Sequence, residues 1–138
     1  MRFVLDASVT CAWYLKNQAT PYSIAVYDAV IAQRHRPLVP EIWRTEVSHV
    51  LIRAVGRRLI TREECRDALA ELDLMRPEVR LLSLTASEIH AIHARWGTSG
   101  FDSVYLELAR RLNLPIAAKD KPLLAAGAAK AGVPIFAP

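Results

Sequence analysis

Short apolar runs alternate along the chain with longer segments in which apolar residues recur every three or four positions. A short run without polar alternation is typical of a strand buried on both faces, so the runs predict about five strands, at residues 2–5, 37–40, 78–84, 114–118 and 133–136. The longer segments predict a helix ending at residue 15 and helices at residues 20–34, 42–56, 61–75, 85–96, 102–113 and 121–131. Strands that alternate with helices favour an α/β fold with a largely parallel sheet.

Two of the helix starts carry a specific local signal. Thr61 with Glu64, and Thr85 with Glu88, have the spacing of a capping box, in which each side chain bonds the backbone of the other residue. These boundaries predict two helices between the second and third strands and two more between the third and fourth.

Composition is consistent with one domain over residues 1–138, because the chain is short and 52% of its residues are apolar. The net charge of +4 is compatible with a polyanionic partner, although a soluble domain with a Lys/Arg-rich surface explains it more simply. Cys11 and Cys65 are expected to be buried free thiols. The sequence has neither a signal-peptide pattern nor an apolar run of about 18 residues, so we expect a cytoplasmic protein that does not enter a membrane.

Three acids lie where the sequence predicts one edge of the sheet. Asp6 directly follows the first strand, and Asp120 follows the strand at 114–118. Asp102 opens the preceding helix; because that helix runs away from the edge and the strand runs back, Asp102 and Asp120 are expected to be neighbours. Ligands of open parallel sheets bind beyond the carboxyl ends of the strands. Taken singly, each acid could instead cap a helix or complement its dipole.

A fourth acid interrupts the apolar face of the helix at 42–56. With a turn of about 100° per residue, Glu46 falls about 40° from Ile42, inside the arc that also contains Val47 and Val50. Because this face is expected to be buried, we predict that Glu46 points inward at the other three acids.

Clustered carboxylates repel each other, and a divalent cation such as Mg²⁺ relieves that repulsion with the oxygen ligands it prefers. Such a site can activate water and offset charge on a phosphate. Other metal sites are less well supported, since His90 and His93 have no third ligand and Cys11 and Cys65 lack ligand spacing.

With these motifs the chain resembles PIN domains, and most closely the small VapC-type ribonuclease toxins. The matching segments cover essentially the full length and read "FVLDASV", "VPEIWRTEVSHVL", "GFDSVYLELARRLNLPIAAKDKPLL" and "GVPIF". The resemblance implies a PIN-like three-layer sandwich and a Mg²⁺- or Mn²⁺-dependent endoribonuclease, the toxin of a type II toxin–antitoxin system. It also implies a homodimer and a cognate antitoxin whose C-terminal segment blocks the acidic site.

The resemblance also implies roles for individual residues. The catalytic and metal-binding acids would be Asp6, Glu46, Asp102 and Asp120, with Glu46 binding directly or through water. Ser8 matches the hydroxyl residue that commonly accompanies the first acid. One position departs from the pattern, because Ala118 stands where family members often have a Thr or Ser that could hold Asp120.

Basic residues around the acids are candidates for holding an RNA backbone, namely Arg53, Lys119 and Lys121. The alternative is that they are solvated helix ends whose charge complements the helix dipole.

Two other functions remain open from the sequence. A haloacid-dehalogenase-like phosphatase would need Asp-x-Asp after the first strand, and Ser8 replaces its second Asp. A non-catalytic or weakly active PIN domain that binds RNA or a protein is favoured by Ala118 and opposed by the retention of all four acids.

Overall fold

The computed structural model describes all 138 residues and is built around a sheet of four parallel strands. The strands lie in the order β3-β2-β1-β4 and span Arg2–Leu5 (β1), Arg36–Pro40 (β2), Glu78–Arg80 (β3) and Ile116–Ala117 (β4). β1 is central: Phe3 pairs with Pro37 of β2, and Leu5 pairs with Ala117 of β4. All four carboxyl ends therefore lie at the same edge of the sheet.

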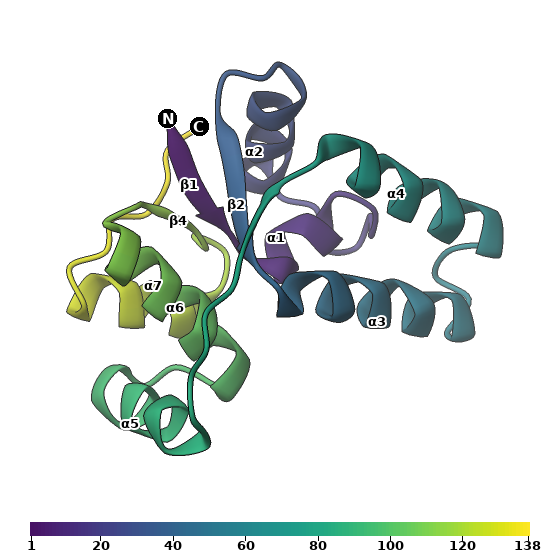
Figure 1. Ribbon diagram of the computed structural model, residues 1–138. Coiled ribbons are helices and arrows are strands. Elements are labelled where there is room, and N and C mark those ends of the chain that lie inside the picture. The colour runs from purple at the N-terminus through teal and green to yellow at the C-terminus, as the bar shows by residue number, and fades with distance from the viewer.

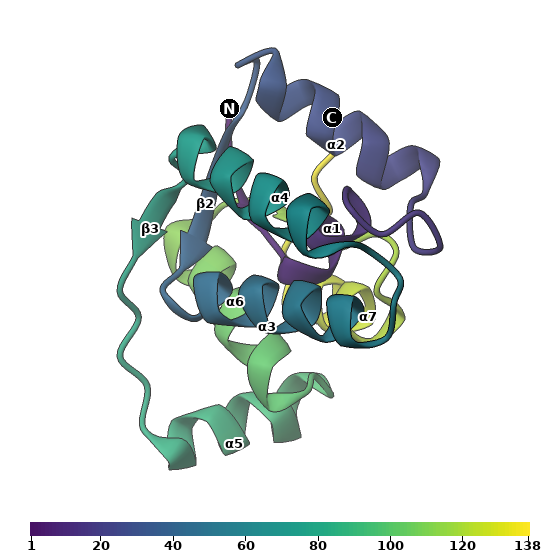
Figure 2. The ribbon, with the colours of Figure 1, turned by 90° about the vertical axis from the view of Figure 1, so that its right-hand side faces the viewer.

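Seven helices surround this sheet, on both of its sides (Figure 1). They span Ala7–Ala12 (α1), Pro21–Ile31 (α2), Ile42–Gly56 (α3), Arg62–Met75 (α4), Ala86–Trp96 (α5), Gly100–Leu112 (α6) and Pro122–Lys130 (α7). Helices α6 and α7 lie on one side and α1 to α4 on the other, while α3 and α4 form an antiparallel pair (Figures 1 and 2). None of the helices combines the length and the apolar character needed to cross a membrane. The predicted α/β class, with helices flanking a parallel sheet, is confirmed.

The predicted helix starts at Thr61 and Thr85 are also confirmed, whereas α6 begins at Gly100 and not at Asp102, because Ser99 caps it. Thr61 and Thr85 each accept a hydrogen bond from the backbone N–H three residues on, and the side chains of Glu64 and Glu88 each accept one from the backbone N–H of the capping residue. Two helices, α3 and α4, lie between β2 and β3, and two, α5 and α6, lie between β3 and β4, as the sequence predicts.

The number and length of the strands differ from the prediction. Residues 133–136 make a single bridge, Ile116 with Ile135, and no fifth strand. The only strand with which they pair is β4, which is two residues long and leaves no room for a ladder. β3 ends at Arg80 and does not continue to residue 84, because Arg80 pairs with Pro40, the last residue of β2.

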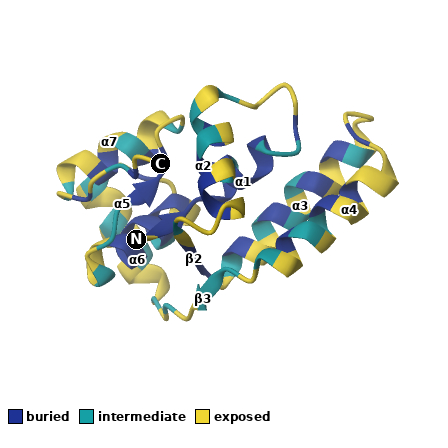
Figure 3. Ribbon diagram, turned by 90° about the horizontal axis from the view of Figure 1, so that it is seen from above, coloured by how far each residue is buried: buried dark blue, intermediate teal, exposed yellow.

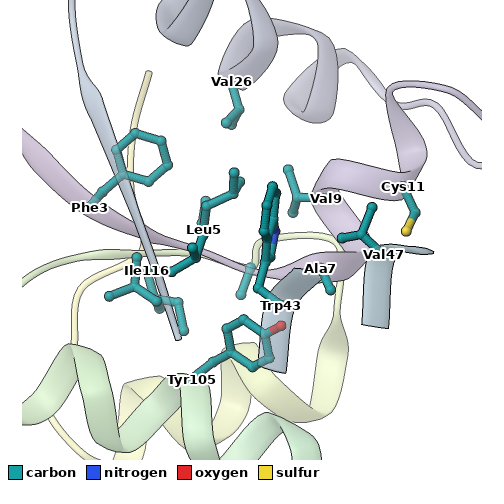
Figure 4. Close-up of a cluster of buried hydrophobic side chains, with 14 of the residues drawn as sticks. Phe3, Leu5, Ala7, Val9, Cys11, Val26, Trp43, Val47, Tyr105 and Ile116 are labelled. Carbon is teal, nitrogen blue, oxygen red and sulfur yellow. The ribbon is translucent and has the colours of Figure 1, made fainter. Parts of the chain in front are cut away.

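The apolar core holds β1 rigidly between the helix layers. Phe3, Val4 and Leu5 are at most 1% exposed, and the ring of Phe3 stacks on Phe136 at a centroid distance of 3.9 Å. Figure 4 shows this cluster, with Tyr105 reaching in from α6. Burial is densest around the sheet and in the inner faces of its helices, whereas α5 has no buried residue (Figure 3). Each buried large apolar side chain contributes about 1.5–3 kcal/mol to the free energy of unfolding. This packing holds the carboxyl end of β1 in place.

Candidate metal centre

Asp6 lies at the carboxyl end of β1 and caps α1, which confirms the structural interpretation of its position. Its Oδ2 atom accepts hydrogen bonds from the backbone N–H of Ser8, at 3.0 Å, and from the Ser8 hydroxyl. The side chain is fully buried, and its Oδ1 atom has no hydrogen-bond partner. Burial raises the pKa of the Asp6 carboxyl, while the nearby Lys121 ammonium and the Ser8 hydroxyl partly oppose that rise.

Asp102 lies in the first turn of α6, behind the capping residue Ser99, and is 3% exposed. Lys121 donates a hydrogen bond of 2.5 Å from its Nζ atom to Asp102 Oδ1. The same Nζ atom is 3.7 Å from Asp6 Oδ1. Burial lowers the pKa of Lys121, but the charges of Asp6 and Asp102 outweigh this effect and the net pKa is raised. The ammonium therefore bridges two buried carboxylates from different elements.

Glu46 is half-buried on α3 and is held by a buried tyrosine. The Tyr105 hydroxyl donates a hydrogen bond of 2.8 Å to Glu46 Oε1, and Tyr105 is fully buried. Burial raises the pKa of Glu46, the Tyr105 hydrogen bond opposes the rise, and the charge of Asp6 adds to it. Burial and then the Glu46 charge also raise the pKa of Tyr105, so this hydroxyl stays a donor. Glu46 thus points inward, toward the buried Tyr105 hydroxyl, and the charges of Asp6 and Asp102 add to the rise of its pKa.

Asp120 lies in the turn after β4 and is exposed. Its Oδ2 atom accepts a hydrogen bond from the hydroxyl of Thr20, the capping residue of α2. Asp120 does not cap α7, since Lys121 holds that position. A cleft of about 290 Å³ lies beside this acid and is lined by Ser8, Val9, Ala12, Gln18, Thr20, Ser23 and Asp120. Asp120 and the residue that supports Asp6 therefore share one cleft.

The structure brings the four predicted acids to one edge but gives each a different internal partner. Asp102 contacts Lys121, the residue that follows Asp120, which agrees with the neighbourhood expected from the chain connectivity. No three His, Cys, Asp or Glu side chains are grouped closely enough to ligate one metal ion. Each acid accepts a hydrogen bond from a different side chain: Asp6 from Ser8, Asp102 from Lys121, Glu46 from Tyr105 and Asp120 from Thr20.

The chemistry of these residues nevertheless fits a divalent cation. Four carboxylates supply the oxygen ligands that Mg²⁺ and Mn²⁺ prefer. Asp6 Oδ1 is a buried charged oxygen without a hydrogen bond, which is costly unless a cation compensates it. The only cation paired with the acids is Lys121, so the site already attracts positive charge.

Two contributors to this site were not identified from the sequence. Tyr105 follows Asp102 by three positions and so lies on the same face of α6, a spacing that could have indicated it. Thr20 has only the local signal of a helix cap, and its contact with Asp120 spans 100 positions. Ala118, which is fully buried, has no hydroxyl that could hold Asp120. In this chain the hydroxyl that contacts Asp120 belongs to Thr20.

The other candidate residues lie around or outside this centre. Lys119 is exposed, with its Nζ atom 5.7 Å from the ring centre of Tyr22. Arg53 is exposed and lines a small cleft of about 80 Å³ that shares Gln18 with the cleft of Asp120. His93 donates a hydrogen bond of 2.6 Å from Nδ1 to the Thr98 carbonyl oxygen.

A larger cleft of about 540 Å³ contains none of the predicted site residues. Arg36 and Glu78, which open β2 and β3, are among its lining residues, so it lies at the edge of the sheet opposite the acids.

Both cysteines are buried free thiols, as predicted.

The amino-acid sequence matches no protein-family model and no curated protein.

Proposed function

We propose that the protein is a Mg²⁺- or Mn²⁺-dependent endoribonuclease that hydrolyses RNA phosphodiester bonds at the four-acid site. One observation carries the proposal: Asp6 and Asp102 are two buried carboxylates that share a single cation at the carboxyl edge of a parallel sheet. Helix capping requires one polar side chain, so it accounts for Asp6 but not for the second carboxylate or the shared ammonium. The likeness of the acid-bearing motifs to those of PIN domains supports the same function.

The chain's own residues would divide the work between binding and proton transfer. A divalent cation bound by the acids would polarise the phosphate and activate a water molecule. Ser8 holds Asp6 through Oδ2, which leaves Oδ1 without a hydrogen bond and 3.7 Å from Lys121 Nζ, and Tyr105 holds Glu46 through Oε1. The other Glu46 oxygen, Oε2, is then the atom that accepts a proton from the attacking water.

The clefts beside the acids suit an RNA backbone. Asp120 and Thr20 line the cleft of about 290 Å³, and Gln18 joins it to the cleft that Arg53 lines. Arg53 and Lys119 are exposed cations that would contact phosphates on either side of the cut bond.

The test is cleavage of an end-labelled structured RNA in Mg²⁺ or Mn²⁺, with and without EDTA. Asp6→Asn and Asp102→Asn should lose at least about 100-fold in rate, because each removes a charged oxygen ligand. Asp28→Asn, which changes an exposed acid of α2, is the matched control. Cleavage that survives EDTA and both substitutions would contradict the assignment.

We further propose that the protein is the toxin of a toxin–antitoxin pair, acting as a homodimer that a cognate antitoxin inhibits. The support is the likeness of its motifs to the VapC-type toxins. Expression of the chain should arrest bacterial growth, whereas the Asp6→Asn chain should not. Rescue of growth by the protein encoded next to it would identify the antitoxin, and normal growth with a fully active nuclease would contradict the toxin role.

A second candidate function is a PIN domain that binds RNA or a protein without cutting it. The separation of the acids onto different internal donors favours it. Calorimetric titration with Mn²⁺ separates the two functions, since this candidate predicts no binding at millimolar metal.

A further inference from the structure

Lys121 occupies an unusual place for a lysine, because its charged end is directed into the acidic site. Its side chain is 32% exposed, and its Nζ atom contacts Asp102 Oδ1 at 2.5 Å and Asp6 Oδ1 at 3.7 Å. No other Lys, Arg or His forms an ion pair with any of the four acids, whose remaining partners are the uncharged groups of Ser8, Tyr105 and Thr20. A single ammonium therefore supplies the counter-charge of the buried pair.

The backbone that carries Lys121 is fixed at this position. Lys121 is the capping residue of α7, and Pro122 at the first helical position restricts the next backbone dihedral. Leu124 and Ala128 anchor α7 in the core. The helix packs so closely that a Cβ atom added to Gly127 would lie 2.6 Å from the methyl group of Thr98. The Lys121 side chain can change conformation while its backbone stays in place.

The ammonium and a divalent cation need the same oxygens. A Mg²⁺ or Mn²⁺ ion in this site would bind through the carboxylates of Asp6 and Asp102, which Lys121 now contacts. If the ammonium and the metal ion both contacted these carboxylates, they would lie a few ångströms apart. Two positive charges that close repel each other strongly in a poorly solvated site. Simultaneous occupation is therefore unfavourable, and one cation replaces the other.

We infer that Lys121 is a tethered cation that occupies the position of the divalent metal and must move out before the metal binds. The inference rests on the proposed metal site and adds a determinant of its affinity. Lys121 pairs with both carboxylates in the metal-free protein, and it lowers the affinity for metal by competing for their oxygens. It is a positioning residue for Asp6 and Asp102.

The experiment is calorimetric titration of the full chain with MnCl₂ alone, without RNA. The chains compared are the unsubstituted protein, Lys121→Gln, Lys121→Arg and Lys130→Gln. Lys130→Gln removes the same charge from an exposed position in the last turn of α7, so it controls for net charge. Lys121→Gln should bind Mn²⁺ at least about tenfold more tightly, because a like charge a few ångströms away has been removed. Lys121→Arg and Lys130→Gln should bind like the unsubstituted protein.

A second measurement guards against a variant that folds poorly. In EDTA the melting temperature of Lys121→Gln should be lower than that of the unsubstituted protein, since two buried carboxylates lose their cation. Saturating Mn²⁺ should then raise the melting temperature of Lys121→Gln by more than it raises that of the unsubstituted protein. If Lys121 had only a structural role, Lys121→Gln would melt at a lower temperature in EDTA but would not bind Mn²⁺ more tightly.

The outcomes separate this inference from the proposed nuclease activity. Equal Mn²⁺ affinity of Lys121→Gln and the unsubstituted chain overturns the inference and leaves the nuclease proposal standing. Tighter binding by Lys121→Gln with no RNA cleavage by any chain supports the inference and overturns the nuclease. Absence of Mn²⁺ binding by every chain at millimolar metal overturns both.

Discussion

Tyr105 of α6 donates a hydrogen bond of 2.8 Å to Glu46 of α3, although the two residues are 59 positions apart in the chain. This bond joins helices from opposite sides of the sheet at the edge where the acids lie (Figure 1). It fixes the one acid of the site that is not close to a strand end or a helix start.

Tyr105→Phe should therefore affect function more than stability. Loss of the hydrogen bond should cost about 1 kcal/mol in the free energy of unfolding, measured with urea. The rate of RNA cleavage should fall several-fold even under conditions in which the variant stays fully folded, because Glu46 is no longer oriented.

Tyr14→Phe is the matched control for this prediction, because the Tyr14 hydroxyl donates a comparable bond of 2.7 Å to Glu71, away from the acids. It should lose similar stability and keep full cleavage. Equal loss of cleavage in the two variants would refute the role given to Tyr105.

Thr20→Val should remove two interactions at once, the cap of α2 and the hydroxyl that holds Asp120. The cap is worth about 1 kcal/mol in the free energy of unfolding. Thr61→Val removes a similar cap from α4 and should cost a similar amount. Only Thr20→Val should also slow RNA cleavage, and Thr20→Ser should restore it. The prediction fails if both valine variants cleave RNA equally well.

Asp6→Asn should stabilise the metal-free protein at neutral pH. The pKa of Asp6 is raised on folding, so the folded state binds the proton more tightly than the unfolded state. The contribution of this group to stability is then fully present below its unfolded pKa and is lost as pH rises through the folded pKa. In EDTA the variant should melt a few degrees higher at pH 7, and this gain should shrink toward pH 4. A gain that does not depend on pH would contradict the assignment to Asp6.

Glu107→Gln should show the opposite dependence on pH. Glu107 is buried and accepts hydrogen bonds from Arg110, at 2.8 and 2.9 Å, and from Arg111, at 2.7 Å. The hydrogen bond from Arg110 is the main cause that lowers the pKa of Glu107, so its stabilisation is present above the unfolded pKa and is lost as pH falls through the folded pKa. Both arginines are nearly half exposed, so we expect a loss of only about 1–2 kcal/mol at pH 7. Urea unfolding at pH 7 and pH 3 measures the difference, which should shrink at the lower pH.

The helices were predictable from the sequence because their signals are local. Capping boxes at Thr61 and Thr85 and apolar residues at helical spacing depend on neighbours within one or two turns. Strand length was less predictable because it depends on the partner strand. Residues 81–84 are apolar enough for a strand, but β2 ends opposite Arg80 and offers them no further pairing.

The sequence by itself determined the α/β architecture and the gathering of Asp6, Asp102 and Asp120 at one edge, because strand direction and helix direction follow from chain order. It also predicted that Glu46 would turn inward. Only the tertiary structure decided what holds each carboxylate. Tyr105, Thr20 and Lys121 reach their acids across 59, 100 and 19 positions, and the packing of α6, α2 and α7 on the sheet sets these distances. Contacts between residues so far apart in the sequence depend on how the helices pack on the sheet, which no local sequence pattern encodes.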